Sequence, residues 1–199
     1  MKRIVLLALV AIMYTSQILA TTLLSLTLRE LVGGSSFIFI GTVTDVVARH
    51  DADLVYTFVS FAIEDVVSGE PAGESLTLRF LGGERDGERT DVAGQFIPAV
   101  GAYGLWFVEA LDEAQVNPLT GWSQGYFPLS EDANGELWLD LRGHPDYGLI
   151  VEPADPLAAK MRGLRFSREQ IAEHFPEEWQ FPLADFVEVI RAVSAEIRE

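Results

Sequence analysis

The sequence predicts a mainly β protein built on a meander of antiparallel strands. Three runs of β-branched and aromatic residues, at 37–47, 54–67 and 76–80, follow one another along the chain. The short stretches between them, 49–53 and 68–74, contain the aspartate, glycine, proline and serine that favour turns. Apolar and polar residues alternate along the third run, as in a strand that buries one face. These observations favour strands that reverse direction at each turn.

Further strands are predicted at 101–111, 121–129 and 136–141. Asn134-Gly135, which precedes the last of them, is a dipeptide preferred in type I′ hairpin turns. Gly104 interrupts the first of them and indicates a bulge or a bend. The β pattern therefore continues to about residue 141.

Composition limits the classes of function. Of the 199 residues, 49% are apolar, which is enough for one domain with a core and an appendage. The formal net charge is −16, from 14 Lys and Arg against 30 Asp and Glu, and it disfavours nucleic acid and anionic membranes as partners. The chain has no cysteine, which excludes disulfides and thiolate metal sites. Its three histidines lack zinc-site spacing, so we expect no metal and no cofactor.

Residues 1–20 have the pattern of a secretory signal peptide. Lys2 and Arg3 precede an apolar run at 4–13, and a polar stretch then leads to the small residue Ala20. We predict cleavage after Ala20, which leaves Thr21 as the N-terminus of a periplasmic or secreted protein without a membrane span. The alternative is an uncleaved anchor, because apolar residues resume soon afterwards.

Helices are predicted on both sides of the β strands. The β domain at 21–141 opens with a short helix whose Thr27 and Glu30 have capping-box spacing. The segment 142–199 is turn-rich and ends in helices, the last of them at about 183–198. An apolar stripe at helical spacing normally docks such a helix on its own domain, and partner binding is the alternative. The stripe consists of Leu183, Phe186, Val187, Ile190, Val193 and Ile197.

One motif points to catalysis. Gly121-Trp-Ser-Gln-Gly125 matches the G-x-S-x-G nucleophile elbow of α/β-hydrolases, with Ser123 as the nucleophile. That elbow requires a buried strand before the serine and a helix after it. Pro118 precedes the motif, and Tyr126-Phe-Pro128 follows it as an extended segment that disfavours a helix. A serine hydrolase is therefore kept as an alternative, and a non-catalytic function is favoured.

Several motifs resemble those of exported bacterial proteins of unknown function. They are I-F-x-G-T-V at 38–43, Y-T-F-V-x-F at 56–61, V-x-x-G-E at 66–70, L-T-L-x-F-x-G-G at 76–83 and G-W-x-Q-G-x-F at 121–127. The resemblance covers about 21–141. It implies a small antiparallel OB-like β-barrel with a short N-terminal helix and a C-terminal helical extension, similar in outline to the netrin and tissue-inhibitor-of-metalloproteinases modules.

The same resemblance suggests a second alternative, inhibition of a secreted metalloproteinase. In the animal modules the amine and carbonyl of an N-terminal cysteine chelate the protease zinc. Here the expected N-terminus is Thr21, and the chain lacks the cysteine whose disulfide holds that segment rigid. A free amine and carbonyl at Thr21 could still chelate zinc.

We therefore expect an exported, non-catalytic binding module for an unidentified protein or envelope ligand. Its binding face is expected between the solvated polar loop Glu84–Gly94 and the segment Gly121–Tyr126, because loops often carry function. The strand aromatics Tyr56, Phe58 and Trp106 are either core residues or stacking platforms. The candidate ligand-binding residues are Trp122, Tyr126, Arg85 and Arg89.

Overall fold

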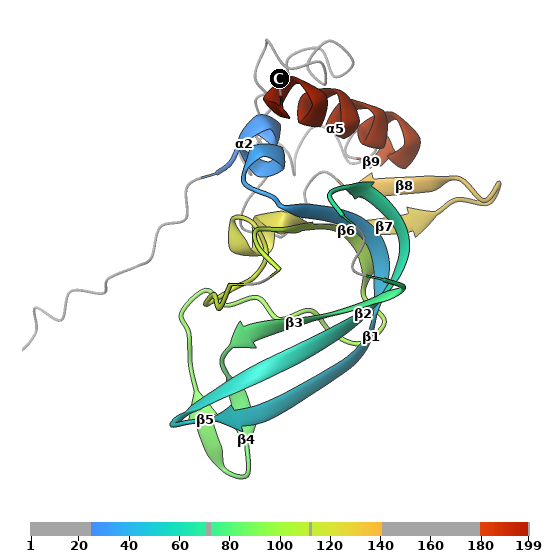
Figure 1. The fold of residues 1–199 in the computed structure, drawn as a ribbon. Helices are drawn as coiled ribbons and strands as arrows, with labels where there is room; N and C mark the ends of the chain where they lie inside the picture. The colour runs from blue at the N-terminus through green and yellow to red at the C-terminus, as the bar shows by residue number, and fades with distance from the viewer. Residues whose placement is uncertain (1–24, 71–72, 112, 141–179, 199) are drawn as a thin grey trace, which may run out of the picture.

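The structure, a computed structural model, describes residues 25–70, 73–111, 113–140 and 180–198 (Figure 1). It contains an antiparallel seven-stranded sheet, ordered β3-β2-β1-β6-β7-β8-β9, and a separate β4–β5 hairpin. The predicted mainly β class is confirmed. The leader at 1–20, the expected N-terminus at Thr21 and the segment 142–179 lie outside the described residues. The elements are α2 (Leu28–Gly33), β1 (Phe37–Asp51), β2 (Leu54–Ser68), β3 (Ser75–Leu81), β4 (Gly83–Arg85), β5 (Glu88–Thr90), β6 (Tyr103–Val108), η1 (Trp122–Gly125), β7 (Tyr126–Glu131), β8 (Leu137–Asp140), β9 (Gln180–Pro182) and α5 (Leu183–Arg198).

The ribbon formed by β1 and β2 is long and bent (Figure 1). Bulges interrupt the pairing of the two strands, and each bulge bends an antiparallel pair and increases its twist. Gly41 is needed beside one of them, because a Cβ there would collide with the carbonyl oxygen of Ala62. Only the first part of β1, Phe37–Thr42, also pairs with β6. The register shifts lie at Ile38/Phe39, Ile40/Gly41 and Val43/Asp45.

The sheet is not closed into a barrel by strand pairing in the part of the chain that the structure describes. Its edges are β3 and β9. A segment outside the named strands connects the β3 edge with β6: Leu81 N donates to Val116 O, and Thr120 N donates to Phe107 O, both at 2.9 Å. The antiparallel sheet is therefore shown, whereas an OB-like barrel is not.

Alternation along β1 and β6 supplies two cores, one on each face of the sheet. Phe37 and Phe39 face one way, and Ile38 and Ile40 face the other. The helix-side core contains Leu28, Leu31, Val32, Ile38, Ile40, Val67, Leu105, Phe107, Phe127, Leu139, Leu183, Phe186, Val187, Val189, Ile190 and Val193. The inner core, within the curved part of the sheet, contains Phe37, Phe39, Val43, Val59, Phe61, Leu78, Phe80, Trp106, Val108 and Leu119.

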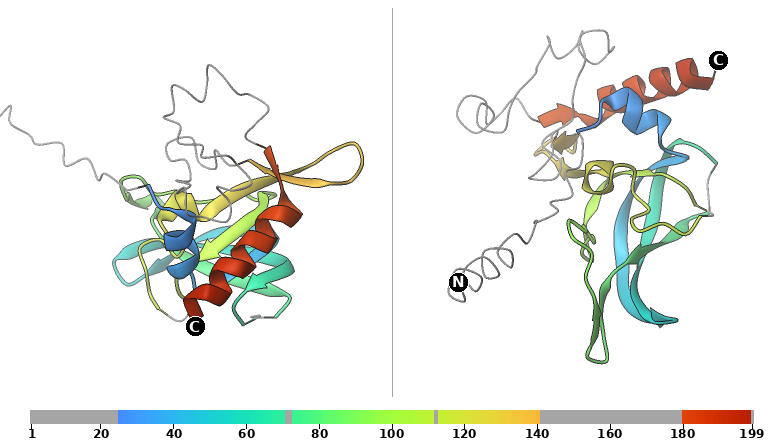
Figure 2. Two further views of the ribbon diagram at one scale, coloured as in Figure 1. Left: turned by 90° about the horizontal axis from the view of Figure 1, so that it is seen from above. Right: turned by 90° about the vertical axis from the view of Figure 1, so that its left-hand side faces the viewer.

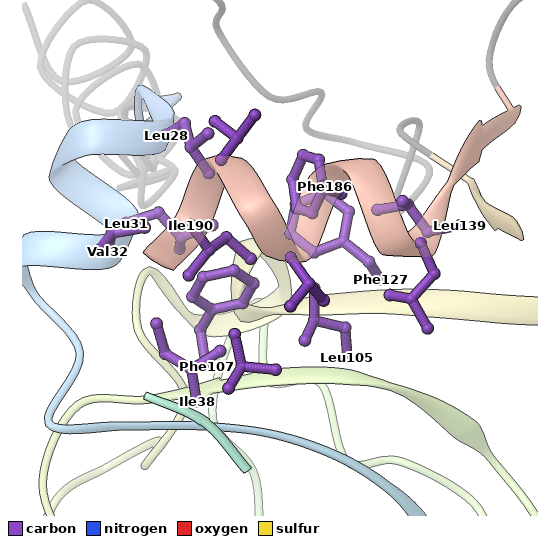
Figure 3. Close-up of a cluster of buried hydrophobic side chains, with 14 of the residues drawn as sticks. Leu28, Leu31, Val32, Ile38, Leu105, Phe107, Phe127, Leu139, Phe186 and Ile190 are labelled. Atoms are coloured by element: carbon purple, nitrogen blue, oxygen red, sulfur yellow. The ribbon is translucent and has the colours of Figure 1, made fainter. Parts of the chain in front are cut away.

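The helices α2 and α5 cover the helix-side core (Figure 3). They contact each other at one end of the molecule, and the β4–β5 hairpin lies at the other end (Figures 1 and 2). The apolar stripe of α5 buries Phe186 and Ile190 completely, as its spacing predicts, whereas Ile197 at its end is exposed. The capping box is present too, since Glu30 N bonds to Thr27 Oγ1 while Thr27 N bonds to Glu30 Oε2. Among the described residues, no helix is long and apolar enough to cross a bilayer.

The structure corrects three local expectations. The strand predicted at 121–129 begins only at Tyr126, because Trp122–Gly125 form the 3-10 helix η1. The polar stretch 81–94 is not wholly a loop, because it contains the β4–β5 hairpin. Asp86 and Gly87 both have positive φ there, 52° and 85°, as a type I′ turn requires. At the β7–β8 hairpin, by contrast, the positive φ belongs to Gly135 and not to Asn134. The predicted hairpin is therefore present, but its predicted type I′ turn is wrong.

Candidate functional site

Tyr126, a predicted ligand-binding residue, lies half-buried in an aromatic stack. Its ring is stacked on Trp106, with centroids 4.1 Å apart, and on Phe96, with centroids 5.6 Å apart. Its hydroxyl donates to Tyr103 O at 3.4 Å. Burial raises the pKa of the Tyr126 phenol. This environment is that of a packing residue at the border of the inner core.

Trp122 begins η1 in an uncommon backbone conformation. It has φ 61° and follows Gly121 at φ 62°, so two consecutive residues are left-handed. A non-glycine residue in this region is costly unless its surroundings hold it there. The backbone N–H of Trp122 donates to Leu119 O at 2.9 Å, and Gln124 N donates to Gly121 O at 3.2 Å. The Trp122 side chain is half-buried, and its role in binding stays a prediction.

Gln124 also holds the N-terminal segment that leads into α2. The Leu26 N–H donates to Gln124 Oε1 at 2.8 Å. Gly121 lies under this segment, since a Cβ there would be 2.5 Å from Leu26 Cδ1. The chain before α2 is therefore fixed to η1 by a hydrogen bond and a close contact. The expected inhibitory N-terminus at Thr21 lies outside the described residues.

The two predicted arginines lie elsewhere, on the β4–β5 hairpin. Arg85 Nε is 3.2 Å from Asp86 Oδ2, and Arg89 Nε is 2.6 Å from Asp91 Oδ1. The hydrogen bond that Arg89 donates to Asp91, together with the negative charge of Asp91, raises the pKa of Arg89. The hairpin forms the end of the molecule farthest from α2 and α5, whereas η1 lies nearer to these helices (Figures 1 and 2). The structure therefore does not bring these arginines together with Trp122 and Tyr126.

Ser123 is the second residue of η1 and only 2% exposed. A nucleophile elbow presents its serine at a turn from a strand into a helix. Ser123 instead follows an irregular segment and leads through a short 3-10 helix into β7. Of the later residues that could complete a triad, Asp140 ends β8, whereas His144, Asp146 and His174 lie outside the described residues. Within the described ranges, no group of three or more histidines and carboxylates could hold a metal ion.

The two strand aromatics Tyr56 and Phe58 are half-buried on the outer face of β2. Their neighbours Thr57 and Val59 point to the inner face and are buried. Trp106 is completely buried in the inner core, and its indole N–H donates to Gly41 O at 2.9 Å. The open alternative for these three aromatics is thus resolved: Trp106 is a core residue, and the other two are surface rings.

An arginine lies over each of the two surface rings. Arg49 Cζ is 5.0 Å from the ring centroid of Phe58, and Arg79 Cζ is 4.5 Å from that of Tyr56. In the strand register, however, Arg49 is opposite Tyr56, and Arg79 is opposite Phe58. Each arginine therefore crosses diagonally to the ring two residues along β2, as long side chains on a sheet can do. We call Arg49, Tyr56, Phe58 and Arg79 the arginine–aromatic face.

The two arginines of this face differ in their polar partners. Arg79 Nη1 donates to Asp51 Oδ2 at 2.9 Å. The exposed guanidinium of Arg49 has the Phe58 ring as its partner and makes no hydrogen bond or ion pair within the described part of the chain. Arginine has five N–H donors in a planar fork that matches carboxylate, sulfate and phosphate groups. Arg49 is therefore positioned by the ring with its polar edges available.

No family model, curated protein or solved structure matches this chain.

Proposed function

We propose that the chain is an exported, non-catalytic binding module and that the arginine–aromatic face is its ligand-binding surface. Export is inferred from the leader pattern at residues 1–20. The observation that carries the binding proposal is the guanidinium of Arg49, held over Phe58 without a polar partner among the described residues. Because the ring already holds this guanidinium in place, a ligand that binds it loses little free energy to ordering of the side chain.

The chemistry of the face favours a ligand with a carboxylate, sulfate or phosphate group. The N–H edges of a stacked guanidinium can bind such a group in a bidentate manner. Asp51 already pairs with Arg79, so Arg49 is the free cation of the face as described. A long polyanion such as nucleic acid is disfavoured, because the whole chain carries a charge of −16. A ligand with an isolated anionic group fits better.

The position of the face supports an OB-like architecture as part of this proposal. OB folds bind their ligands across the face of their second and third strands. Tyr56 and Phe58 belong to β2, and Arg79 belongs to β3. The bent β1–β2 ribbon and the contact of residue 116 with β3 are features that such a barrel needs. The fold and the binding face thus support each other.

Ligand capture by the 21–199 chain tests the proposal. The immobilised protein is incubated with the native extracellular or periplasmic fraction, and with panels of carboxylated, sulfated and phosphorylated glycans and peptides. We expect Arg49→Gln and Phe58→Ala to lose a ligand that the wild type retains. Arg191→Gln is the matched control, because Arg191 is also a surface arginine but is paired with Asp65. Capture that is identical in all four proteins would contradict the assignment of this face.

The catalytic alternative has its own test. A fluorophosphonate probe labels activated serines, so labelling of the wild type that disappears in Ser123→Ala would replace the binding module with a serine hydrolase. We expect no such labelling, because Ser123 is nearly inaccessible and does not occupy an elbow.

A further inference from the structure

At the β3 edge of the sheet, the structure determines which residues form backbone hydrogen bonds to β2 and which direct their backbone groups outward. In an antiparallel pair, alternate residues bond to the neighbouring strand, and the residues between them direct their N–H and C=O groups to the other side. Ile63 N donates to Glu74 O before β3, and Gly82 N donates to Val55 O after it, both at 2.9 Å. The register between these two bonds has no shift, so the alternation continues from Glu74 to Gly82. The even-numbered residues of β3 therefore form the backbone hydrogen bonds to β2.

The odd-numbered residues of β3 therefore direct their backbone groups away from the sheet. Leu81 shows this directly, since its N–H donates to Val116 O and its carbonyl accepts from Gln95 Nε2 at 2.8 Å. Ser75, Thr77 and Arg79 have the same orientation, and within the described ranges no residue pairs with their outward groups. Thr77 is also exposed. An edge with unpaired backbone groups is a template for another strand.

We propose that β3 pairs antiparallel with β3 of a second copy of this chain, about a twofold axis at Thr77. Outward-facing residues of the two copies must lie opposite one another, and an axis at Thr77 pairs all three of them, Ser75, Thr77 and Arg79. Ser75 of each copy then faces Arg79 of the other, and the ladder ends where Val116 already occupies Leu81. The proposal uses the backbone edge and does not depend on the ligand of the arginine–aromatic face.

The side chains of β3 match this twofold pairing on both faces. On the outer face, two threonines meet at the axis, which is a favourable cross-strand pair, and serine faces arginine with no like charges opposed. On the inner face, the half-buried Leu76 of each copy faces Leu78 of the other, so pairing covers apolar surface that the monomer leaves in water. An edge that complements itself in this way favours a second copy over an unrelated strand, and twofold dimers are the commonest oligomers.

The acidic charge of the chain opposes this association. The full chain carries −16, and the 21–199 chain, without Lys2 and Arg3, carries 12 − 30 = −18, so two copies repel each other at low ionic strength. Salt screens exposed charges over roughly 10 Å at 0.1 M and roughly 3 Å at 1 M. The dimer is therefore expected to tighten as sodium chloride is added. A contact made by ion pairs would weaken instead.

Light scattering of the 21–199 chain across protein and salt concentrations measures the dimer. Thr77→Pro removes the outward N–H at the axis but no backbone hydrogen bond to β2, and proline is tolerated on edge strands. It also removes the exposed bond between the Thr77 and Ser60 hydroxyls, a loss that the Thr77→Val control shares. We expect the dissociation constant of the Thr77→Pro dimer to rise by about tenfold or more, because both copies lose a donor. Thr77→Val keeps the N–H and the β-branched shape, and it is the control that stays dimeric. Circular dichroism checks that both variants are folded.

Cross-linking provides a second readout that does not require proline. The wild type has no cysteine, so Thr77→Cys introduces a single thiol at the axis, and Asn134→Cys introduces one at an exposed hairpin turn as the control. A short bifunctional thiol reagent is expected to link the first into dimers much faster than the second. The proposal is overturned by a wild type that is monomeric at all salt concentrations. Equal cross-linking of the two thiols, or a Thr77→Pro dimer as tight as the wild type, also overturns it.

Discussion

Gly104 shows how one missing side chain determines the packing of a whole aromatic stack. The sequence suggests a bulge or bend at this glycine, yet its pairing with Gly41 and with Pro128 continues without a shift. The physical reason for glycine is the close approach of Tyr126, whose Cε2 a Cβ at residue 104 would overlap, and of Phe127 O, which would be 2.7 Å away. A sequence pattern marks the glycine but cannot show which atom lies above it.

Gly104→Ala is accordingly expected to destabilise the fold. The added methyl cannot move away from the Tyr126 ring, because the backbone oxygen of Phe127 lies close to it as well and cannot rotate aside. The Tyr126–Trp106 stack therefore has to shift. Overpacking of this kind costs about 1–3 kcal/mol, measurable as a lower free energy of unfolding in urea. Gly33→Ala is the control, because its Cβ would meet only Ile197 Cδ1 at 3.4 Å. Equal effects of the two substitutions would contradict this explanation.

The capping box of α2 makes a pH-dependent contribution to stability. The hydrogen bonds from the Thr27 backbone N–H and hydroxyl lower the pKa of Glu30 below its ordinary value of 4.5. Because the pKa is lower in the folded state, the contribution is fully present above about pH 4.5 and is lost as the pH falls through the folded-state pKa.

We therefore expect Glu30→Gln to lower the unfolding free energy near neutrality, where the carboxylate contribution is fully present, and to approach the wild type as the pH falls, so that its unfolding free energy depends less on pH in the acid range. Urea unfolding at a series of pH values measures this slope. Glu196→Gln is a suitable control on the neighbouring helix, since Glu196 pairs with Arg29 at the exposed surface and makes no capping bond. If Glu30→Gln had the same dependence of unfolding free energy on pH as the wild type, the capping box would not be the source of that dependence.

At the scale of elements, hydrophobic and turn patterns predict where strands lie better than how each turn is made. The strands at 37–47, 54–67 and 76–80 are all present, because alternation and β-branched residues act locally. The turn at Asn134-Gly135 takes another form because Asp132 Oδ1 accepts from the backbone N–H groups of Asn134 and Glu136. These bonds also lower the pKa of Asp132. A side-chain acceptor three residues before a glycine therefore outweighed the dipeptide preference.

The arginine–aromatic face could be anticipated only in part. The alternation of β2 places Tyr56 and Phe58 on one side of the strand, but it does not say whether that side is covered. Bringing Arg49 and Arg79 to the same rings depends on the register of both neighbouring strands, and a bulge at Val43/Asp45 shifts one of them. Register over a long bulged pair is a tertiary property, so no local pattern in the sequence contains it.

Docking of α5 is expected to depend on its apolar stripe and not on its surface charges. Ile190 is completely buried against the sheet, and Ile190→Ala should cost about 2–5 kcal/mol of unfolding free energy. Glu196 forms an exposed ion pair with Arg29, and an exposed pair contributes at most about 1 kcal/mol, so Glu196→Ala should have a much smaller effect. Urea denaturation of both variants compares them. A larger effect of Glu196→Ala would mean that charge, not burial, holds the helix.

For the whole molecule, the decisive feature is that the two cores share their strands. Successive residues of β1 enter opposite cores, and so do successive residues of β6. Neither core can lose its packing without removing support from the strands that build the other. Helices and curved sheet are therefore parts of one cooperative unit, although α2 and α5 come from opposite ends of the described chain (Figure 1).

We expect the protein to unfold in a single transition. Far-UV circular dichroism and tryptophan fluorescence should give the same urea midpoint, as in two-state unfolding. Ile190→Ala in the helix-side core and Leu78→Ala in the inner core should each move both signals together, because each variant weakens strands common to both cores. If Ile190→Ala instead shifted only the helical signal and left the fluorescence midpoint unchanged, α5 would be an independent layer. The shared strands β1 and β6 would then not couple the two faces of the sheet.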